Sequence, residues 1–341
     1  MARRALSPTC LALVQCLERE VPPALAATGL SSCRIGLSGG ADSLALTAAM
    51  AWARDHRRGP LAEVAVSVRV VDHGLQVGSA GVADRAAQQA RDLGLEVDIV
   101  RVTVAVDGSG IEAAARTARY SALSYGDPAL VLLAHTLDDQ AETVLLGLAR
   151  GSGTRSLAGM PTRRDQILRP FLSVRRTDTE RACRDWGLTW WNDPTNEDPA
   201  FTRSRLRAAM PLLEETLGPG FAEGLARTAD LARQDADFLD DQAAQVGLDI
   251  TQPALPLAEL QSLPVVVRQR LLLAWLRQVG TDAVSREHVL AVDSLLMDWH
   301  GQKSITVPSA QVTRTPTHLQ QTSSDKVSHG DSPPDSWGQS P

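Results

Sequence analysis

The residues with the most recognisable chemistry form one short run that joins an apolar stretch to an Ala/Leu-rich stretch: Ser38, Gly39, Gly40, Ala41, Asp42 and Ser43. Two consecutive glycines let the backbone approach a ligand closely and adopt positive φ angles. A helix expected over residues 43–54 would add unpaired N–H groups and the positive end of its dipole. The run therefore predicts a pyrophosphate pocket in which the serines donate hydrogen bonds and Asp42 holds Mg²⁺ against the phosphates.

This run matches neither of two common phosphate-binding motifs. It lacks the Gly-Lys-Ser/Thr ending of the Walker loop, and it lacks the G-x-G-x-x-G pattern of dinucleotide-binding folds. The structural alternative is a tight strand-to-helix turn in which Asp42 and Ser43 only cap the helix. Such a turn does not require the whole string, so the phosphate-binding interpretation is favoured.

A second group of candidate residues comprises His135, Asp138 and Glu142, which follow another short apolar run. Asp138 and Glu142 are four positions apart, so on a helix both carboxylates lie on one face. Such a pair can bind an ammonium group, orient a metal or accept a proton from an attacking amine. The alternative is a helix N-terminus capped by Thr136, where the acidic side chains only complement the dipole.

Two further pairs are candidates for nucleotide contacts. Asp72 and His73 follow a β-branched run and could contact a bound nucleotide, although His73 fits a simple turn equally well. Arg116 and Arg119 share one face of a helix expected over residues 111–125. Arg116 could stabilise the charge on a departing pyrophosphate, whereas we expect Arg119 to lie on a solvated face.

The middle of the chain is basic although the whole chain has a net charge of −6. Residues 150–184, called here the basic segment, contain nine arginines against three acidic residues, an excess of +6. Arginine and nearby tryptophan side chains can hold RNA phosphates and unstacked bases, although a solvated face is the usual role of a charge run. The RNA contacts predicted here are Arg163, Arg164, Arg203, Arg205 and Arg207.

Alternating strands and helices position these residues. Apolar runs at 33–37, 64–71, 97–104 and 129–134 are typical of strands, and helical patterns separate them at 43–54, 80–94, 111–125 and 138–150. This alternation predicts an α/β fold with a doubly wound, mostly parallel sheet. The polar clusters follow the strands, at the carboxyl edge where such sheets bind ligands.

The remaining chain divides by composition. We predict an amphipathic helix in 1–30, the α/β domain in 31–207 with an arginine-rich extension from 151, a smaller and mainly helical domain in 208–321, and a disordered tail in 322–341. Segments 304–307 and 311–315 are expected to form a small terminal hairpin.

Composition narrows the function classes. No apolar run approaches the ~20 residues of a membrane span, and charges interrupt the N-terminus too early for a signal peptide. We therefore expect that the protein does not associate with a membrane and that it is cytoplasmic. The four cysteines form no Cys-x-x-Cys pair, which argues against a zinc site, an iron–sulfur cluster or a disulfide framework. The same scatter argues against sulfur transfer.

The run at 38–43 resembles the SGGxDS loop of the PP-loop (N-type ATP pyrophosphatase) superfamily, whose enzymes split ATP between the α and β phosphates to form an adenylate. Within it, neighbouring strings are similar to those of the tRNA(Ile)-lysidine synthetase family: VDHGL at 71–75, IEAAAR at 111–116, AHTLDDQAET at 134–143, RGSG at 150–153, RPFL at 169–172 and WNDPTN at 191–196. The resemblance is specific over 34–215 and vague beyond it.

The resemblance implies a ligase that uses ATP and Mg²⁺. The wobble cytidine of the isoleucine tRNA with a CAU anticodon would be adenylated at C2, and free L-lysine would displace AMP to give lysidine. This product changes the codon read from AUG to AUA. The resemblance also implies that the string around His135 serves the ATP and lysine sites, that Arg116 binds phosphate, and that 208–321 binds tRNA.

One departure and two alternatives accompany this interpretation. The family usually has Arg-Asn-x-x-Arg where this chain has Arg203-Ser204-Arg205-Leu206-Arg207, so the amide is absent although serine can still donate a hydrogen bond. The alternatives are a PP-loop enzyme of tRNA 2-thiolation and a nucleotide-binding regulator without catalysis. The sequence leaves open the oligomeric state, the tRNA features that are recognised and the individual roles of the residues between His135 and Glu142.

Overall fold

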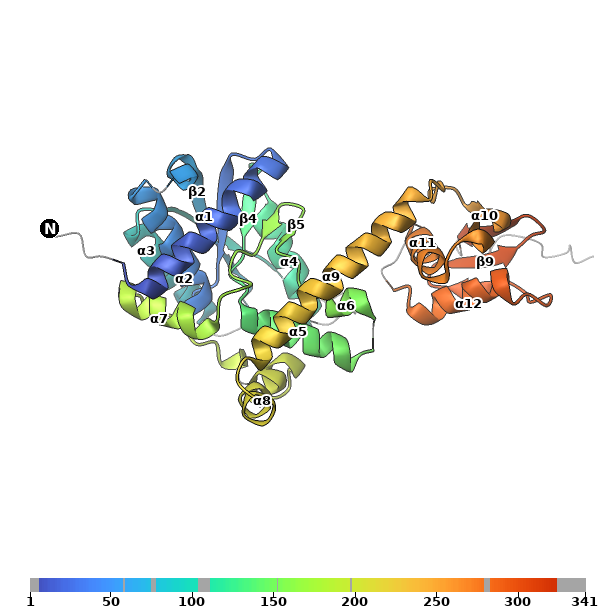
Figure 1. The fold of residues 1–341 in the computed structure, drawn as a ribbon. Helices are drawn as coiled ribbons and strands as arrows, with labels where there is room; N and C mark the ends of the chain where they lie inside the picture. The colour runs from blue at the N-terminus through green and yellow to red at the C-terminus, as the bar shows by residue number, and fades with distance from the viewer. Residues whose placement is uncertain are drawn as a thin grey trace, which may run out of the picture. The chain divides into compact units, whose positions relative to one another are not determined.

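The computed structural model describes residues 6–57, 59–74, 78–103, 111–151, 153–196, 198–278 and 283–323 (Figure 1). The chain forms two compact units, Met1–Leu231 and Ala232–Pro341. The division falls within helix α9 (Phe221–Gln245), later than the boundary predicted between 207 and 208. The difference arises because Met210 of helix α8 (Thr202–Leu217) and Ala222 of α9 pack against helix α5 (Leu137–Ala149) of the first unit.

The first unit is built on a six-stranded sheet with the strand order β3-β2-β1-β4-β6-β5. All neighbouring strands pair in parallel except β5 and β6, so the predicted mostly parallel, doubly wound sheet is confirmed. In chain order the strands are β1 (Ser32–Leu37), β2 (Ala65–Asp72), β3 (Glu96–Arg101), β4 (Leu130–Leu132), β5 (Arg163–Arg164) and β6 (Ile167–Leu168).

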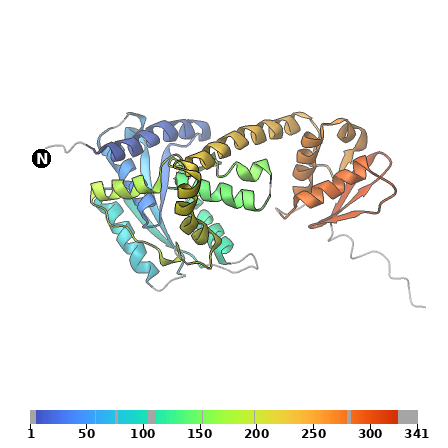
Figure 2. The same cartoon turned by 60° about the horizontal axis from the view of Figure 1, so that its bottom comes forward.

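Helices cover both faces of this sheet (Figure 2). The main core joins buried side chains of α1, α2 and α3 to the central strands, and α7 packs on α2. Helix α2 is buried on nearly every side because small and aliphatic residues fill it, which fits its central position. The helices are α1 (Pro8–Thr28), α2 (Ala41–Asp55), η1 (Gly59–Glu63), α3 (Ser79–Asp92), α4 (Ile111–Ser124), α6 (Thr154–Leu157), α7 (Arg176–Trp186) and η2 (Pro194–Asn196).

Two buried arginines support the sheet at the edge opposite the phosphate loop. Arg34 and Arg69 lie on adjacent strands and are 7% and 9% exposed. Their guanidinium groups donate hydrogen bonds to the carbonyls that end α4, including those of Leu123 and Tyr125. Arg69 also pairs with Asp98 at 2.6 Å. The cations therefore complete the C-terminus of α4, where carbonyl groups lack partners within the helix.

Replacing Arg69 with methionine is expected to lower the free energy of unfolding by roughly 2–4 kcal/mol, because the substitution leaves buried carbonyls and Asp98 without their donor. Urea unfolding followed by circular dichroism measures the change. Arg101→Met is the matched control, since the Arg101 side chain on neighbouring β3 is 77% exposed. Equal stability of the two variants would show that the buried contacts contribute little.

The second unit combines helices with a four-stranded antiparallel sheet ordered β7-β10-β9-β8. Its core gathers apolar side chains around the fully buried Trp275. The elements are β7 (Ala254–Pro256), α10 (Leu257–Ser262), α11 (Val265–Arg277), α12 (Arg286–Met297), β8 (Ile305–Val307), β9 (Ala310–Arg314) and β10 (His318–Ser323).

The predicted terminal hairpin is present as β8 and β9, but the sheet is larger than expected because β10 and β7 extend it. Two residues of the predicted tail, Thr322 and Ser323, instead pair with Gln311 and Ala310 in β10. Leu319 supplies the buried anchor that holds this polar strand in place. The rest of the predicted tail, 324–341, lies outside the described residues. No helix in the described part of the chain is long and apolar enough to cross a membrane.

Candidate functional site

The phosphate loop, residues 38–43, connects β1 to α2 in a conformation that its glycines permit. Gly39 has a φ of +84°, and a Cβ atom there would lie 3.3 Å from Cβ of Ala86. Gly40 is the N-cap of α2, and no side chain caps its free N–H groups. These groups and the helix dipole are therefore available to an anion. The alternative in which Asp42 or Ser43 caps the helix does not describe this turn.

The two serines of the loop bond to each other. The Ser38 backbone N–H donates to Oγ of Ser43 at 3.2 Å, and the two hydroxyl oxygens lie 3.1 Å apart. The Ser43 hydroxyl also lies 3.0 Å from the Gly40 carbonyl, to which it donates. These bonds hold the loop in shape before a ligand arrives, which reduces the entropy lost on binding.

Asp42 points from the loop toward α7. Its carboxylate accepts hydrogen bonds from the Thr179 hydroxyl and, at 3.3 Å, from Nε of Arg176. Burial raises the pKa of Asp42 to about 6, although Arg176 and Thr179 favour the charged form. Asp42 therefore joins the phosphate loop to a second set of charged residues.

That set is an acidic cluster made of Asp42, Asp138, Asp139 and Glu142. The Arg176 guanidinium lies among three of its members, at 2.6 Å from Asp139, 3.3 Å from Asp42 and 3.7 Å from Glu142. Asp138 accepts the backbone N–H of Arg176 at 2.7 Å. Carboxylates gathered around one guanidinium repel one another. The cluster therefore requires this cation when no ligand is present.

The geometry separates the two interpretations of the acidic string. Asp139 and Thr136 form a capping box at the start of α5, so the helix-cap alternative applies to Asp139. The side chain of Glu142 is 1% exposed and pairs with Arg207 at 2.9 Å. Asp138 and Glu142 do not cap the helix; they lie with Asp42 in the acidic cluster.

The basic residues occupy different environments. Arg163 and Arg164 are exposed on β5, where an RNA backbone could reach them, and Arg203 is half-buried. Arg205 donates to the carbonyl of Pro199 at 2.6 Å. Arg207, predicted to contact RNA, has its guanidinium on Glu142 instead.

Sequence reasoning overlooked the roles of Arg175, Arg176 and Thr179. Arg175 lies 3.5 Å from Asp138 and 3.1 Å from Glu214. The two arginines were counted only as part of the positive excess of the basic segment. The sequence offered one signal for these roles. The two arginines are adjacent at the start of a helical pattern, so both lie near the same part of the fold. The hydroxyl of Ser204, where the family usually has asparagine, donates to the carbonyl of Thr195 at 3.0 Å.

The residues predicted to contact a nucleotide lie at the carboxyl end of β2 and on α4. Asp72 is buried, and hydrogen bonds from Ser79 and from the Gly74 backbone lower its pKa. Arg119 is exposed, as expected, and it donates from Nε to Nε2 of His73 at 3.2 Å. Burial lowers the pKa of His73, so its neutral ring can accept this bond. Arg116 is exposed, and its guanidinium lies 5.0 Å from the centre of the Tyr120 ring.

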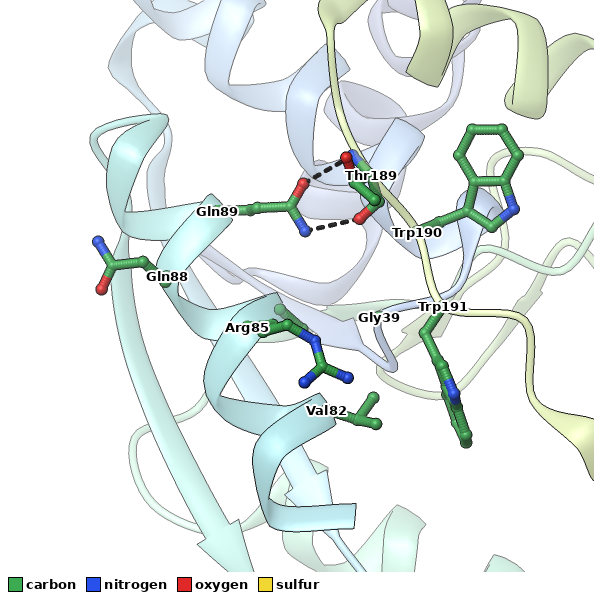
Figure 3. Close-up of a pocket in the computed structure, with 9 residues that line it drawn as sticks. Gly39, Val82, Arg85, Gln88, Gln89, Thr189, Trp190 and Trp191 are labelled. Carbon is green, nitrogen blue, oxygen red and sulfur yellow. Dashed lines mark hydrogen bonds between the residues drawn. The ribbon is translucent and has the colours of Figure 1, made fainter. Parts of the chain in front are cut away.

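A cavity of about 410 Å³ opens beside the phosphate loop, between α3 and residues 189–191 (Figure 3). The backbone N–H of Trp191 donates to the Gly39 carbonyl at 3.0 Å. The Gln89 side-chain amide bonds both the N–H and the carbonyl of Thr189, at 3.0 and 2.8 Å. Trp190 is partly buried against the main core and also lines this cavity.

The implied Mg²⁺ can be tested against this geometry. Among the described residues, no three or more His, Cys, Asp or Glu side chains are arranged so that they could hold a metal ion by themselves. Magnesium does not need such a group, because one or two carboxylates together with substrate phosphates suffice. Asp42, which is part of the phosphate loop, has the right donor chemistry, provided that its carboxylate is released by Arg176. The residues therefore fit an ion held between protein and nucleotide.

Comparisons with known proteins identify two family models in the chain. A model described as a PP-loop domain matches residues 14–213, and one described as a TilS substrate binding domain matches residues 255–319. The first covers the phosphate loop and the acidic cluster. The second covers α10, α11, α12 and most of the sheet of the second unit.

Curated relatives match most of the chain. The tRNA(Ile)-lysidine synthase of Leifsonia xyli is 49% identical and aligns over 82% of this chain and 86% of its own length. The proteins of that name from Mycobacterium bovis and Thermobifida fusca are 49% and 48% identical, covering 81% and 89% of this chain and 84% and 94% of their own lengths. Among solved structures, the U34-tRNA thiolase NcsA of Methanococcus maripaludis shares the fold, with a TM-score of 0.50, 18% identity, and coverage of 66% of this chain and 80% of that one.

Proposed function

The chain belongs to the tRNA(Ile)-lysidine synthase family, and from this premise we propose how its residues divide the reaction. The chain is an ATP-using ligase that forms lysidine on isoleucine tRNA. We propose that the target is the wobble cytidine of the CAU anticodon and that the nucleophile is free L-lysine. This division of the reaction between two groups of residues rests on one observation: Asp42 joins an uncapped phosphate loop to the acidic cluster.

The ATP half of the reaction is assigned to the phosphate loop. The free N–H groups at the start of α2 and the Ser38 and Ser43 hydroxyls would bind the pyrophosphate part of ATP. Mg²⁺, when bound at Asp42, would neutralise phosphate charge. The cytosine C2 oxygen attacks the α-phosphorus, pyrophosphate leaves, and the oxygen thereby becomes part of a good leaving group. Arg116 is proposed to balance the charge of the departing pyrophosphate.

The amine half is assigned to the acidic cluster. Its carboxylates suit the ammonium groups of lysine, and one of them would take a proton from the ε-ammonium to free the nucleophilic lone pair. The nitrogen then bonds to C2 of the cytidine while the bond from C2 to the AMP oxygen breaks. Asp138 and Glu142 are the proposed carboxylates, and until lysine arrives Arg175 pairs with Asp138 and Arg176 with Glu142.

The proposal is tested by nucleoside mass spectrometry after the protein, ATP and isotopically labelled lysine are incubated with the CAU isoleucine tRNA. The expected result is one labelled nucleoside heavier than cytidine, with one AMP and one pyrophosphate released per product. ATP use without labelled product, or label on another tRNA, would refute the assigned substrates. A sulfur-transfer activity gains no support, because all four cysteines are buried.

RNA binding by the basic segment is expected to depend strongly on salt, since phosphate contacts release counterions. If about five phosphates are neutralised, log affinity should fall against log salt with a slope of roughly −4 or steeper. Replacing Arg163 and Arg164 together with glutamine should flatten this slope by about one to two units and leave ATP affinity unchanged. Filter binding of tRNA at several salt concentrations measures the slope.

The control for this prediction is the double change of Arg19 and Arg57 to glutamine, which removes the same charge from exposed positions outside the basic segment. That variant should keep the parent slope. If the Arg163 and Arg164 variant also keeps it, RNA recognition belongs elsewhere in the chain.

A further inference from the structure

Arg169 is buried with an unused hydrogen-bond donor. Only 5% of the residue is exposed, and it follows directly after β6. Its Nη1 donates to the carbonyl of Pro161 at 3.0 Å, but its buried Nε has no partner. A buried donor on a charged group is costly to leave unpaired, so such a position points to a ligand that completes it.

His135 has a second unpartnered atom at the same edge of the sheet. It follows β4, the parallel neighbour of β6, and its buried Nδ1 has no hydrogen-bond partner. The pairing continues beyond the strands, since the Leu133 N–H donates to the Leu168 carbonyl at 2.9 Å. Both side chains therefore emerge from adjacent strands at the carboxyl edge, where sheets of this type bind ligands.

The alternation of side chains indicates the face of the sheet on which these groups lie. Val131, Leu133 and Ile167 pack around Leu123 of α4. Because strand side chains alternate with a period of two, a backbone that remains extended brings the side chains at 135 and 169 to this same α4 side. Arg116 lies on α4 itself.

The surroundings of His135 are cationic. Burial lowers its pKa to about 4, and Arg169, Arg116 and Arg203 act in the same direction, against Asp139. The imidazole is therefore neutral near pH 7 and can donate one N–H, while several guanidinium groups add positive charge. Donors without acceptors in a positive environment are the complement of a phosphate group.

We propose that Arg169 and His135, flanked by Arg116 and Arg203, form a phosphate-binding site on the α4 side of the sheet, separate from the acidic cluster. The inference rests on the proposed function, because both ATP and tRNA supply phosphates to this edge. The site would fix a phosphate while Asp42 and the acidic cluster bind the cationic partners. It adds Arg169 to the residues that bind substrate.

The test measures binding alone, by titration calorimetry with pyrophosphate and ATP and by filter binding with tRNA. Arg169→Gln removes the charge and the free donor, and His135→Asn removes an atom that has no partner in the free protein. Arg34→Gln is the matched control, since Arg34 is a similarly buried arginine at the opposite edge of the sheet. Thermal unfolding of every variant accompanies the measurements.

Both site variants are expected to weaken phosphate binding about tenfold or more, whereas Arg34→Gln keeps the parent affinity. Loss confined to pyrophosphate and ATP identifies the nucleotide as the source of the phosphate. Loss confined to tRNA, with a salt slope reduced by about one, identifies the RNA backbone.

Unchanged affinities for all three probes in folded variants would overturn the proposal. If Arg169→Gln fails to fold, His135→Asn and Arg203→Gln decide the question in the same way. Failure of the proposed function is distinguishable, because it would appear as absent lysidine formation by the parent protein whatever the variants bind.

Discussion

Replacing Asp42 with asparagine is expected to lower adenylate formation by at least two orders of magnitude while the fold remains intact. The amide keeps the size of the side chain and its bond to Thr179, but it removes the charge that would hold Mg²⁺ on the phosphates. Metal-assisted charge neutralisation contributes several kcal/mol to such reactions. Release of pyrophosphate from ATP in the presence of tRNA, without lysine, measures this step.

The same variant should be at least as stable as the parent at pH 7.5. Burial raises the pKa of Asp42 from 3.8 to about 6, so folding favours the protonated carboxyl. The resulting stability is present below about pH 4 and is lost as pH rises through about 6. Asparagine is neutral and therefore avoids this loss of stability. The gain is worth roughly 3 kcal/mol at most, and it is reduced because Arg176 loses its partner. Thermal unfolding without metal at pH 5 and pH 7.5 checks the direction.

Asp55→Asn is the control for Asp42, because Asp55 lies at the other end of α2 and pairs with the neighbouring Arg54 at the surface. It should retain parent activity. Near-normal pyrophosphate release by Asp42→Asn would remove Asp42 from the metal assignment and leave it as the link between the phosphate loop and Arg176.

Replacing Glu142 with glutamine is expected to slow the lysine-dependent step by about two orders of magnitude or more, the usual size of a general acid–base contribution. The ATP-dependent step should change only a few-fold, because Glu142 is not part of the phosphate loop. Glutamine keeps the shape and one acceptor for Arg207, which alanine would not. Quenched-flow measurement of AMP transfer to tRNA without lysine, and then of lysidine formation with it, separates the steps.

Glu214→Gln is the matched control, since Glu214 also pairs with an arginine near the cluster, Arg175 at 3.1 Å, but lies outside the proposed amine site. It should leave both steps within a few-fold of the parent. An equal fall of the two steps in Glu142→Gln would assign Glu142 to ATP binding or to the fold.

Local patterns in the sequence were sufficient to predict the strands β1 to β4 and the phosphate loop, but not the short strands β5 and β6. The strands are short apolar runs and the loop is a continuous string, so each is specified by neighbours in the chain. The α/β class followed from their alternation, and the carboxyl-edge location of the site followed from parallel pairing. The small C-terminal sheet was only half predicted, because β7 is three residues long and pairs with a strand far along the chain.

The pairing of charges could not be predicted in this way. Arg176 reaches Asp42 across 134 positions, and Arg207 reaches Glu142 across 65. From the sequence, Arg176 contributed only to the positive excess of the basic segment, and Arg207 was predicted to contact RNA. The folded chain pairs both arginines with carboxylates of the acidic cluster. It also buries Arg169 beside His135.

The chemical groups of this protein and the alternation of strands and helices in its α/β sheet could be inferred from the sequence alone. So could the resemblance that indicates an ATP-using tRNA ligase. The tertiary structure alone decided which of those groups face one another. The physical reason is the range of the forces involved. Backbone conformation and amphipathic period depend on residues within a turn or a strand, whereas the pairing of a buried charge depends on whichever opposite charge the packing of distant elements brings within about 4 Å.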